Sequence, residues 1–409
     1  MARSRRPYPR LLATALACAA AIWARSARSQ AAPAPHPVAA AVAVAATTPV
    51  TSRQALGKAI FFDARLSEPA GTSCASCHDP ARAFSGDHGS GAGVPAGSRP
   101  GVLARRASPS LLYLRYVPQF RFFSDDDDNH AIDLEPYGGF FWDGRADSVA
   151  ELVRQPLLNP REMNNRDLAQ LADKLRSAPY AADFAREFPG ALDGVDSAAG
   201  ALGLALQAFL LSPAMAPFSS KYDDYIRGTA HLTEQEKKGL ELFKDPKRGG
   251  CATCHKLMDT SSSPESSMFT DYGYEAVGAP RNPRGPAVDD DLGLCERPNT
   301  ENPSNSNDYC ANFRTPSLRN VAVRKGLMHN GAFTNLRDVI VFYATRATNP
   351  RRWYPSGTSF DATPPQYRRE IDTRSVPYNR RPGDAPAFDD AEIDAIVAFL
   401  RTLTDRRHP

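Results

Sequence analysis

Apolar residues recur at helical spacing in several separate stretches of the chain. The clearest stretch is residues 389–405, where one helix face would collect five apolar positions: Ile393, Ile396, Val397, Leu400 and Leu403. Residues 197–211 are apolar on most faces, which predicts a helix buried in a core. Helices are also predicted at four further ranges: 54–62, 166–176, 181–188 and 334–345. Between the helices we expect four long irregular stretches: 85–105, 121–139, 257–312 and 346–388.

A different pattern marks the first fifty residues. Arginines precede an apolar run, Leu11 to Ala24, which has the form of a secretory signal peptide over residues 1–30 and is too short to span a bilayer. Residues 31–51 form an uncharged Ala/Pro-rich linker. Ser4-Arg5-Arg6 also resembles a twin-Arg signal and Cys18 a lipid-anchor site, but no leucine stands three positions before Cys18. We therefore expect a periplasmic protein, exported by a cleaved N-terminal signal.

Composition places the chain among folded globular proteins. Of its 409 residues, 42% are hydrophobic and 23% charged, which excludes a disordered, fibrous or membrane-embedded chain. The formal net charge is +3, but residues 1–30 hold six arginines and no acid, which leaves −3 for the remainder. No basic patch stands out in the sequence, so we expect no nucleic-acid partner. The run of four acids at residues 125–128 favours a solvated loop over a metal site.

Four cysteines fall into two copies of one motif. Residues 74–78 read Cys-Ala-Ser-Cys-His and residues 251–255 read Cys-Ala-Thr-Cys-His, the C-x-x-C-H attachment signature of c-type haem. Two thiols at this spacing can add to the two vinyl groups of one haem, and the adjacent histidine can ligate its iron. A thioredoxin-like pair or a Cys₄ zinc site needs no such histidine. The sequence therefore predicts two covalently bound haem c groups, held by Cys74, Cys77, His78, Cys251, Cys254 and His255.

Haem attachment bears on export as well. The haems would be attached after export of an unfolded chain, whereas a twin-Arg route carries folded cargo. The two haem motifs therefore favour the ordinary secretory signal.

Two cysteines remain in the expected mature chain. Cys295 and Cys310 lie in a loop rich in Asn, Pro and Ser. In an oxidising compartment we expect them to form a structural disulfide, stabilising the fold by about 3 kcal/mol; two free thiols are the alternative.

The two haem motifs suggest two domains. Thr233-Glu-Gln-Glu236 has the form of a capping box and predicts a new helix shortly before the second motif. We predict an N-terminal haem domain over residues 52–222 and a C-terminal haem domain over residues 223–409.

Five further short motifs occur in addition to the two haem motifs. They are residues 138–146 (GGFFWDGRA), 156–163 (PLLNPREM), 315–320 (TPSLRN), 328–331 (MHNG) and 341–343 (VFY). With the haem motifs, they resemble the bacterial dihaem cytochrome c peroxidase family, which includes the MauG-type enzymes. The resemblance runs from about residue 55 to residue 404. It implies a mainly α fold of two cytochrome c-like helical domains, each with one covalent haem c, facing across an interface.

The resemblance also implies roles for single residues. The N-terminal haem, ligated by His78, would be the peroxide site, and the C-terminal haem, ligated by His255, the electron-transfer site. Trp142 matches the tryptophan between the haems, where its π-system can carry an electron. Glu162 matches the distal carboxylate, which can move a proton between the two oxygens of peroxide. Tyr343 matches the distal ligand of the C-terminal haem in MauG-type enzymes, where typical peroxidases have methionine and where a phenolate favours oxidised iron.

Each of these three residues also has a plainer interpretation. Trp142 would then be a buried core aromatic, Glu162 a surface residue on a loop, and Tyr343 a core tyrosine.

The chain departs from the family pattern at several positions. The family's distal glutamine corresponds to Leu152, with Gln155 nearby but off register. The asparagine that supplies a calcium ligand between the haems corresponds to Ala107, so calcium is doubtful, and our hypothesis is that the Arg324 cation partly replaces it.

Two histidines need an interpretation of their own. His88 is the nearest candidate for a displaceable ligand to the N-terminal haem, although a solvated loop histidine is the favoured interpretation. His329 is interpreted as an interhaem or propionate-linked residue rather than an axial ligand.

The sequence thus predicts a periplasmic enzyme that reduces hydrogen peroxide at the N-terminal haem, using electrons passed through the C-terminal haem. The expected donor is a small soluble cytochrome c or cupredoxin. The alternatives are MauG-like, peroxide-dependent oxidation of a Trp or Tyr in a partner protein, and a non-enzymatic dihaem electron carrier. The protein is not expected to span a membrane, and its oligomeric state is left open.

Overall fold

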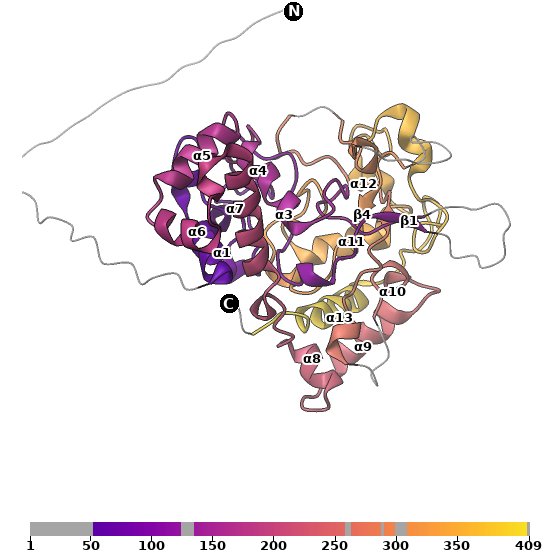
Figure 1. Ribbon diagram of the computed structural model, residues 1–409. Helices are drawn as coiled ribbons and strands as arrows, with labels where there is room; N and C mark the ends of the chain where they lie inside the picture. Colours follow the sequence, from indigo (N-terminus) through magenta and orange to yellow (C-terminus); the bar gives the residue numbers. More distant parts are fainter. Residues whose placement is uncertain (1–51, 124–134, 258–262, 288–289, 299–308, 407–409) are drawn as a thin grey trace, which may run out of the picture. The chain divides into compact units, whose positions relative to one another are not determined.

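The computed structural model describes residues 52–123, 135–257, 263–287, 290–298 and 309–406 (Figure 1). The predicted signal peptide and linker and the acidic run at 125–128 lie outside the described residues. The described residues belong to one compact unit, whose first residue is Thr48. Within it, the chain is mainly helical and builds two large hydrophobic cores.

The first core surrounds helix α7 (Val195–Leu210), which packs against α1 (Arg53–Phe61), α3 (Val149–Leu152) and α5 (Leu168–Arg176). The short helices α4 (Arg154–Leu158) and α6 (Ala181–Glu187) contribute to the same core. In Figure 1 these helices lie together in indigo and magenta. The prediction that residues 197–211 form a core helix is confirmed, since Leu202, Leu206 and Phe209 are buried; Leu204 is the exposed exception.

The second core surrounds α13 (Asp390–Arg401), which packs against α9 (Glu234–Lys244) and α11 (Leu336–Thr345). Helix α8 (Lys221–Ile226) adjoins them. All five predicted apolar positions from Ile393 to Leu403 are buried. The predicted helix 389–405 ends earlier, at Arg401, because the chain turns there and the buried Asp405 carboxylate instead accepts hydrogen bonds from Tyr113 and Asn320.

In each core, the helix that precedes the haem motif packs against the last long helix of that core, and a glycine lies at the contact. A Cβ on Gly57 of α1 would lie 1.9 Å from the carbonyl oxygen of Ala205 in α7. A Cβ on Gly239 of α9 would lie 2.0 Å from the carbonyl oxygen of Ala395 in α13. Only glycine allows backbones to approach this closely. In both cores, a close backbone contact at a glycine therefore fixes the helix that leads into the haem motif.

The haem motifs themselves form single helical turns, α2 (Cys74–Cys77) and α10 (Cys251–Cys254). Helix α12 (Pro350–Trp353) is equally short. The predicted capping box is confirmed: the backbone N–H of Glu236 donates to the Thr233 hydroxyl at 3.3 Å, and the backbone N–H of Thr233 donates to the Glu236 carboxylate at 2.7 Å.

Two small antiparallel sheets lie within the stretches predicted as irregular or next to them. Strand β1 (Arg121–Phe123) pairs with β2 (Glu135–Tyr137), with Phe122 opposite Pro136. Strand β3 (Tyr274–Glu275) pairs with β4 (Phe313–Arg314), with Tyr274 opposite Arg314. Strands of two or three residues are too short to leave a period-2 pattern in the sequence, which is why they were not predicted.

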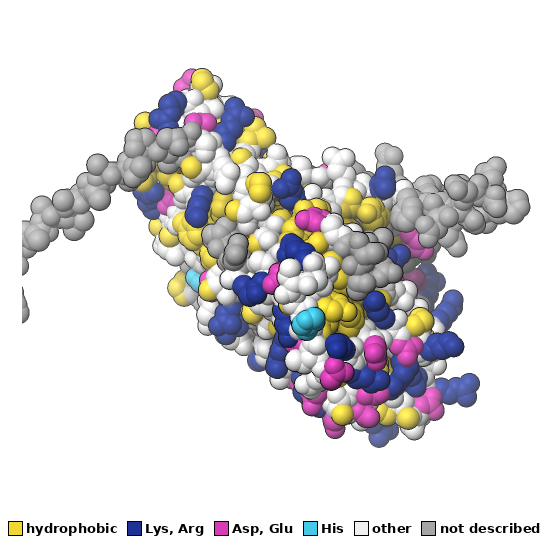
Figure 2. Space-filling model, turned by 90° about the horizontal axis from the view of Figure 1, so that it is seen from below, with side chains coloured by type: hydrophobic (Ala, Val, Ile, Leu, Met, Phe, Trp, Pro, Cys, Tyr) yellow, Lys and Arg dark blue, Asp and Glu magenta, His cyan; other side chains and the backbone are white. Residues whose placement is uncertain are grey.

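The face of the molecule in Figure 2 carries cationic and anionic side chains interspersed with apolar areas. In the part of the chain that the structure describes, no helix has both the length and the apolarity needed to cross a membrane.

Candidate active site

Two cavities in the described part of the chain each contain one haem motif. The N-terminal cavity, of about 380 Å³, is lined by Cys74, Cys77 and His78. The C-terminal cavity, of about 330 Å³, is lined by Cys251, Cys254 and His255. Because the two pairs of thiols line different cavities, they do not meet as a Cys₄ zinc site, and the described residues contain no cluster of three or more His, Cys, Asp or Glu placed to hold a metal ion.

The local fold orients both motif histidines in the same way. The Nδ1 atom of His78 lies 3.0 Å from the carbonyl oxygen of Phe84, and the Nδ1 atom of His255 lies 3.1 Å from that of Phe269. A ring that donates from Nδ1 to a backbone carbonyl keeps the Nε2 lone pair for a metal. Burial lowers the pKa of His78 to about 4 and also lowers the pKa of His255, so both rings are neutral, as iron ligation requires. The thiols and histidines therefore fit a haem c in each cavity.

Two half-buried cations that line the C-terminal cavity support the same fit. Arg314 and Arg324 both line it, and neither forms an ion pair with a carboxylate among the described residues. Burial lowers the pKa of both, to about 10 for Arg324, whose Nε atom has no hydrogen-bond partner there. A buried cation is costly unless an anion accompanies it. The two propionates of a haem would supply that anionic charge. The idea that Arg324 replaces calcium stays a prediction, which one tightly held calcium per chain in a metal analysis would contradict.

Trp142 lines both cavities, together with Ser108 and Pro109. Its indole Nε1–H donates to the carbonyl oxygen of Ala107 at 2.9 Å, which fixes the ring. Gly144, two residues later, has φ +67° and leaves room for the Tyr274 hydroxyl, which a Cβ would meet at 2.0 Å. The loop that carries Trp142 is therefore held between the two cavities.

Glu162 lines the N-terminal cavity that contains His78. Burial raises the pKa of its carboxyl, while the Arg145 cation and a hydrogen bond from the Asn159 amide at 2.7 Å oppose that rise. The net pKa stays above the ordinary value of a glutamate. The carboxyl thus lines the cavity beside the haem motif, and its raised pKa suits it to accept and return a proton there.

Gln155 is a residue of this cavity that sequence reasoning set aside. It lines the wall, and its amide oxygen accepts a hydrogen bond from Arg145 Nε at 2.8 Å. Arg145 also pairs with Asp143 at 3.0 Å and lies over the Phe141 ring. The position in register, Leu152, lines the same cavity, so a comparison by register alone did not point to Gln155.

Tyr343 lines the C-terminal cavity together with a second tyrosine, Tyr378. Their rings stack with centroids 5.9 Å apart, and Arg346 lies over the Tyr378 ring. Burial raises the pKa of both phenols. Tyr378 lies in a stretch predicted as irregular, so no periodic signal in the sequence pointed to it.

His88 and His329, the two histidines interpreted separately in the sequence, lie in different surroundings. His88 lines neither cavity; its Nδ1 atom lies 2.8 Å from the carbonyl oxygen of Ala96 in a loop. His329 lines the C-terminal cavity and stacks on Phe313 with ring centroids 3.5 Å apart. Burial lowers the pKa of His329 to about 4, so its ring is neutral.

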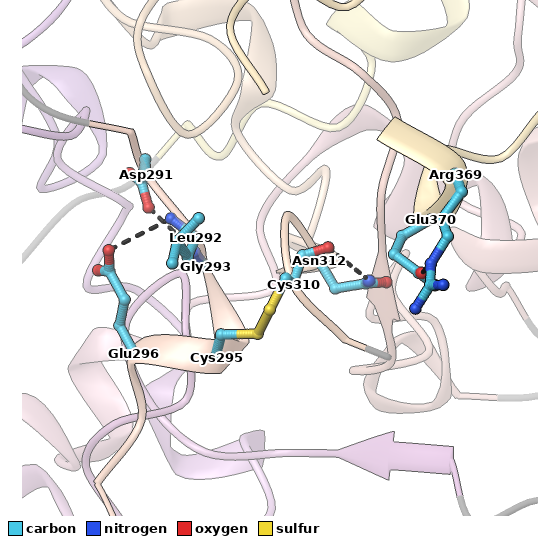
Figure 3. The surroundings of a disulfide bond; sticks show 9 residues. All are labelled: Asp291, Leu292, Gly293, Cys295, Glu296, Cys310, Asn312, Arg369 and Glu370. Carbon is cyan, nitrogen blue, oxygen red and sulfur yellow. Dashed lines mark hydrogen bonds and ion pairs between the residues drawn. A yellow bond between two sulfur atoms is a disulfide. The ribbon is translucent and has the colours of Figure 1, made fainter. Parts of the chain in front are cut away.

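A disulfide anchors the segment that contains Glu296 (Figure 3). Cys295 and Cys310 form the predicted disulfide. The adjacent Glu296 lines the cavity and pairs with Arg106 at 3.2 Å, and Arg106 pairs with Asp291 at 2.6 Å. The disulfide thus supports the acids that neutralise a cation of the cavity wall.

Comparison with known proteins adds to this geometry. Residues 51–231 match the model of the di-haem cytochrome c peroxidase family. The methylamine utilization protein MauG of Paracoccus denitrificans is 36% identical over 371 residues, which cover 87% of this chain and 89% of that protein. The chain belongs to the di-haem cytochrome c peroxidase family, which includes MauG proteins.

Two further relatives support the assignment to this family. The crystal structure of the diheme peroxidase BthA from Burkholderia thailandensis is 47% identical, with a TM-score of 0.82, and the match covers 88% of each chain. A cytochrome c551 peroxidase of Pseudomonas aeruginosa is 29% identical over 71% of this chain and 72% of that protein. The predicted family and the mainly helical fold class are confirmed, and the protein is an oxidoreductase that acts on peroxide. Membership in a di-haem family also makes haem its cofactor.

Proposed function

We propose that this family member reduces hydrogen peroxide in the N-terminal cavity with electrons that pass through the C-terminal cavity. The observation that carries the proposal is the placement of Glu162, a half-buried carboxyl with a raised pKa in the same cavity as Cys74, Cys77 and His78. An electron carrier has no use for a proton-exchanging group at that place. The cavities would each hold one haem c, attached through the motif cysteines and ligated by the motif histidines.

A bound haem would supply the iron that binds peroxide and takes up electrons. The chain supplies the proton chemistry: the Glu162 carboxylate would accept a proton from one oxygen of hydrogen peroxide and return it to the other oxygen, which leaves as water. Asn159 orients the carboxylate, and Arg145 stabilises its charge. With two electrons and two protons, one peroxide yields two waters. Trp142, which lines both cavities, is the residue that we propose to carry electrons between them.

The test is the Glu162→Gln variant, which keeps the shape of the side chain and removes the exchangeable proton. We expect its second-order rate constant with hydrogen peroxide to fall by a factor of about 100 or more. Stopped-flow absorption of the haem bands measures the rate constant. Glu241→Gln, at an exposed glutamate of α9, is the matched control. An unchanged rate constant in Glu162→Gln would show that the carboxyl has no catalytic part.

A second candidate is MauG-like oxidation of a Trp or Tyr in a partner protein. Tyr343 in the C-terminal cavity and the 36% identity to a MauG protein favour it. Steady oxidation of a reduced small cytochrome c by peroxide would support the peroxidase output. Absence of that turnover, with a change of mass in a co-purified partner treated with peroxide, would support the MauG-like output.

We also propose the domain limits and the location given by the sequence. The N-terminal domain would comprise residues 52–222 and the C-terminal domain residues 223–409. The buried residues of the first core precede residue 222 except for Met268, and those of the second core follow residue 222 except for Tyr222 itself. The signal at residues 1–30 would direct the chain to the periplasm, where its disulfide is stable. N-terminal sequencing of the protein recovered from a periplasmic fraction tests this location.

A further inference from the structure

Residues 346–388, the basic segment, differ in charge from the rest of the protein. The segment contains eight arginines, no lysine and four carboxylates, whereas the chain beyond residue 30 has a net charge of −3. From its sequence pattern this segment was expected to be a long irregular stretch, and it did not stand out as a basic patch. Figure 1 shows it in orange and yellow, with α12 at its start.

The basic segment forms a wall of the C-terminal cavity. Its residues Ser375, Val376, Pro377 and Tyr378 line that cavity. Arg346 holds the wall in place, because its guanidinium donates to the carbonyl oxygens of Val277 and Asp372 and covers the Tyr378 ring. Further along, the backbone N–H of Gly383 donates to the carbonyl oxygen of Thr348 at 3.0 Å. The segment is thus folded back against the end of α11 rather than extended into solvent.

Its exposed arginines carry charge that the described chain does not neutralise. Arg351, Arg352, Arg374 and Arg381 are exposed, and none forms an ion pair with a carboxylate in the described ranges. Some exposed cations of other elements have such partners: Arg176 pairs with Asp173, Arg186 with Asp183, and Arg337 with Asp390 and Asp394. Others, such as Arg53, Arg99 and Arg154, are also without an ion pair among the described residues. The cations of the N-terminal cavity, Arg105, Arg106 and Arg145, are also paired. Four exposed arginines without an ion pair in the described ranges therefore lie in the one segment that walls the C-terminal cavity.

An aromatic series connects this surface to the cavity. Tyr343 lines the cavity, and its ring contacts Phe342 at 5.8 Å between centroids. Phe342 meets Trp353 of α12 edge-on at 5.4 Å. Trp353 is half-buried, and the exposed Arg352 lies over its ring at 4.8 Å. Close-packed aromatic rings at a partly exposed position are suited to the centre of a protein interface.

We propose that the basic segment, including the half-buried Trp353 of α12, is the docking surface for a redox protein with a carboxylate-rich face, which exchanges electrons with the C-terminal haem. The inference rests on the proposed function for the direction of electron flow. Each encounter moves one electron: the partner loses it and the haem iron gains it, and no atom is transferred. The acidic face of the partner would place its redox centre against the wall formed by residues 375–378.

The test measures electron transfer without peroxide, so its outcome is independent of the peroxidase proposal. The fully reduced holoprotein is mixed with oxidised plant plastocyanin, an acidic protein, or with oxidised mitochondrial cytochrome c, a basic protein. Stopped-flow loss of the reduced haem bands gives each rate constant at ionic strengths from about 10 mM to about 300 mM. We expect the plastocyanin rate to be the higher at low salt and to fall steeply with salt.

Two triple variants test whether the arginines of the basic segment cause the salt-dependent rate. The triple variant Arg351→Gln, Arg352→Gln, Arg374→Gln should lower the low-salt plastocyanin rate about tenfold or more and remove most of its salt dependence. The control triple variant Arg166→Gln, Arg176→Gln, Arg186→Gln changes the net charge equally on exposed sites of the other core and should leave the rate within about twofold.

A binding measurement is independent of electron transfer. Titration of the oxidised holoprotein into oxidised plastocyanin, followed by calorimetry, should give a dissociation constant that rises about tenfold in the first triple variant only. Equal effects of the two triple variants, or faster reaction with the basic cytochrome c at low salt, would overturn the proposal.

Discussion

At the residue scale, the site depends on how burial changes ordinary side chains. His78 and His255 are neutral because they are buried, and each is oriented by one backbone carbonyl. Glu162 is half-buried in the same cavity as His78, and its pKa is raised rather than lowered, since Arg145 and Asn159 compensate only part of the cost of burying its charge. These residues were predicted from motifs, but their protonation depends on neighbours that are distant in the chain.

The raised pKa of Glu162 predicts a pH dependence. The proposed proton transfer needs the carboxylate, so the second-order rate constant with peroxide should rise with pH and level off above the pKa of Glu162. That pKa is above the ordinary value of about 4.3, and the inflection should therefore lie at a higher pH than for an exposed glutamate. Stopped-flow rates between about pH 4 and pH 8 measure it. If the Glu162→Gln variant keeps the same inflection, another group is responsible.

At the element scale, each haem motif is placed by a pair of helices in close contact. Gly57 lets α1 approach α7, and Gly239 lets α9 approach α13. The position of α2 and α10, and hence of the thiols and histidines, follows from these contacts because each motif comes soon after the glycine-containing helix. The equivalence of the two arrangements explains how one chain repeats a haem site.

Replacement of these glycines tests the close contact. Alanine favours helix over glycine by up to about 1 kcal/mol, so an unhindered Gly→Ala change should stabilise. At Gly57 the added Cβ would meet the Ala205 carbonyl, and we expect Gly57→Ala to lower the free energy of unfolding by about 1–3 kcal/mol. Gly200→Ala in α7 is the control, since nothing lies within 4 Å of its Cβ position. Denaturant titration followed by circular dichroism measures both, and equal stabilisation by the two changes would argue against the close contact.

At the scale of the whole molecule, one buried ion pair joins the two cores. Arg319 pairs with Asp223 at 3.0 Å, and their side chains are 1% and 0% exposed. The Arg319 guanidinium lies over the ring of Phe218 from the first core and the ring of Phe269 from the second. Arg319 belongs to the motif at residues 315–320, so part of that motif is explained by connecting the cores rather than by chemistry.

Replacement of Arg319 should therefore lower the stability of the protein. Arg319→Met keeps much of the volume but leaves the Asp223 carboxylate buried without its cation, and we expect a loss of about 3–5 kcal/mol in stability. Arg337→Met, at an exposed pair, is the control and should change stability by less than about 1 kcal/mol. Thermal and denaturant unfolding of the holoprotein give both values, and similar small losses would contradict a connecting role for Arg319.

The sequence alone determined the features that depend on neighbours along the chain. The haem motifs are recognisable because attachment needs two thiols and a histidine at fixed spacing. The long helices follow from apolar periodicity, and the capping box from four consecutive residues. The disulfide was predictable from composition and compartment, since two cysteines were left over.

The tertiary structure decided what depends on residues distant in the chain. Only folding brings Gln155 into the cavity of Glu162, stacks Tyr378 on Tyr343, and places Trp142 in the walls of both cavities. Only folding leaves Arg314 and Arg324 half-buried without a carboxylate among the described residues, and sets the basic segment against the C-terminal cavity. Burial and pairing are properties of the packed chain, because the cost of a charge depends on what surrounds it in space.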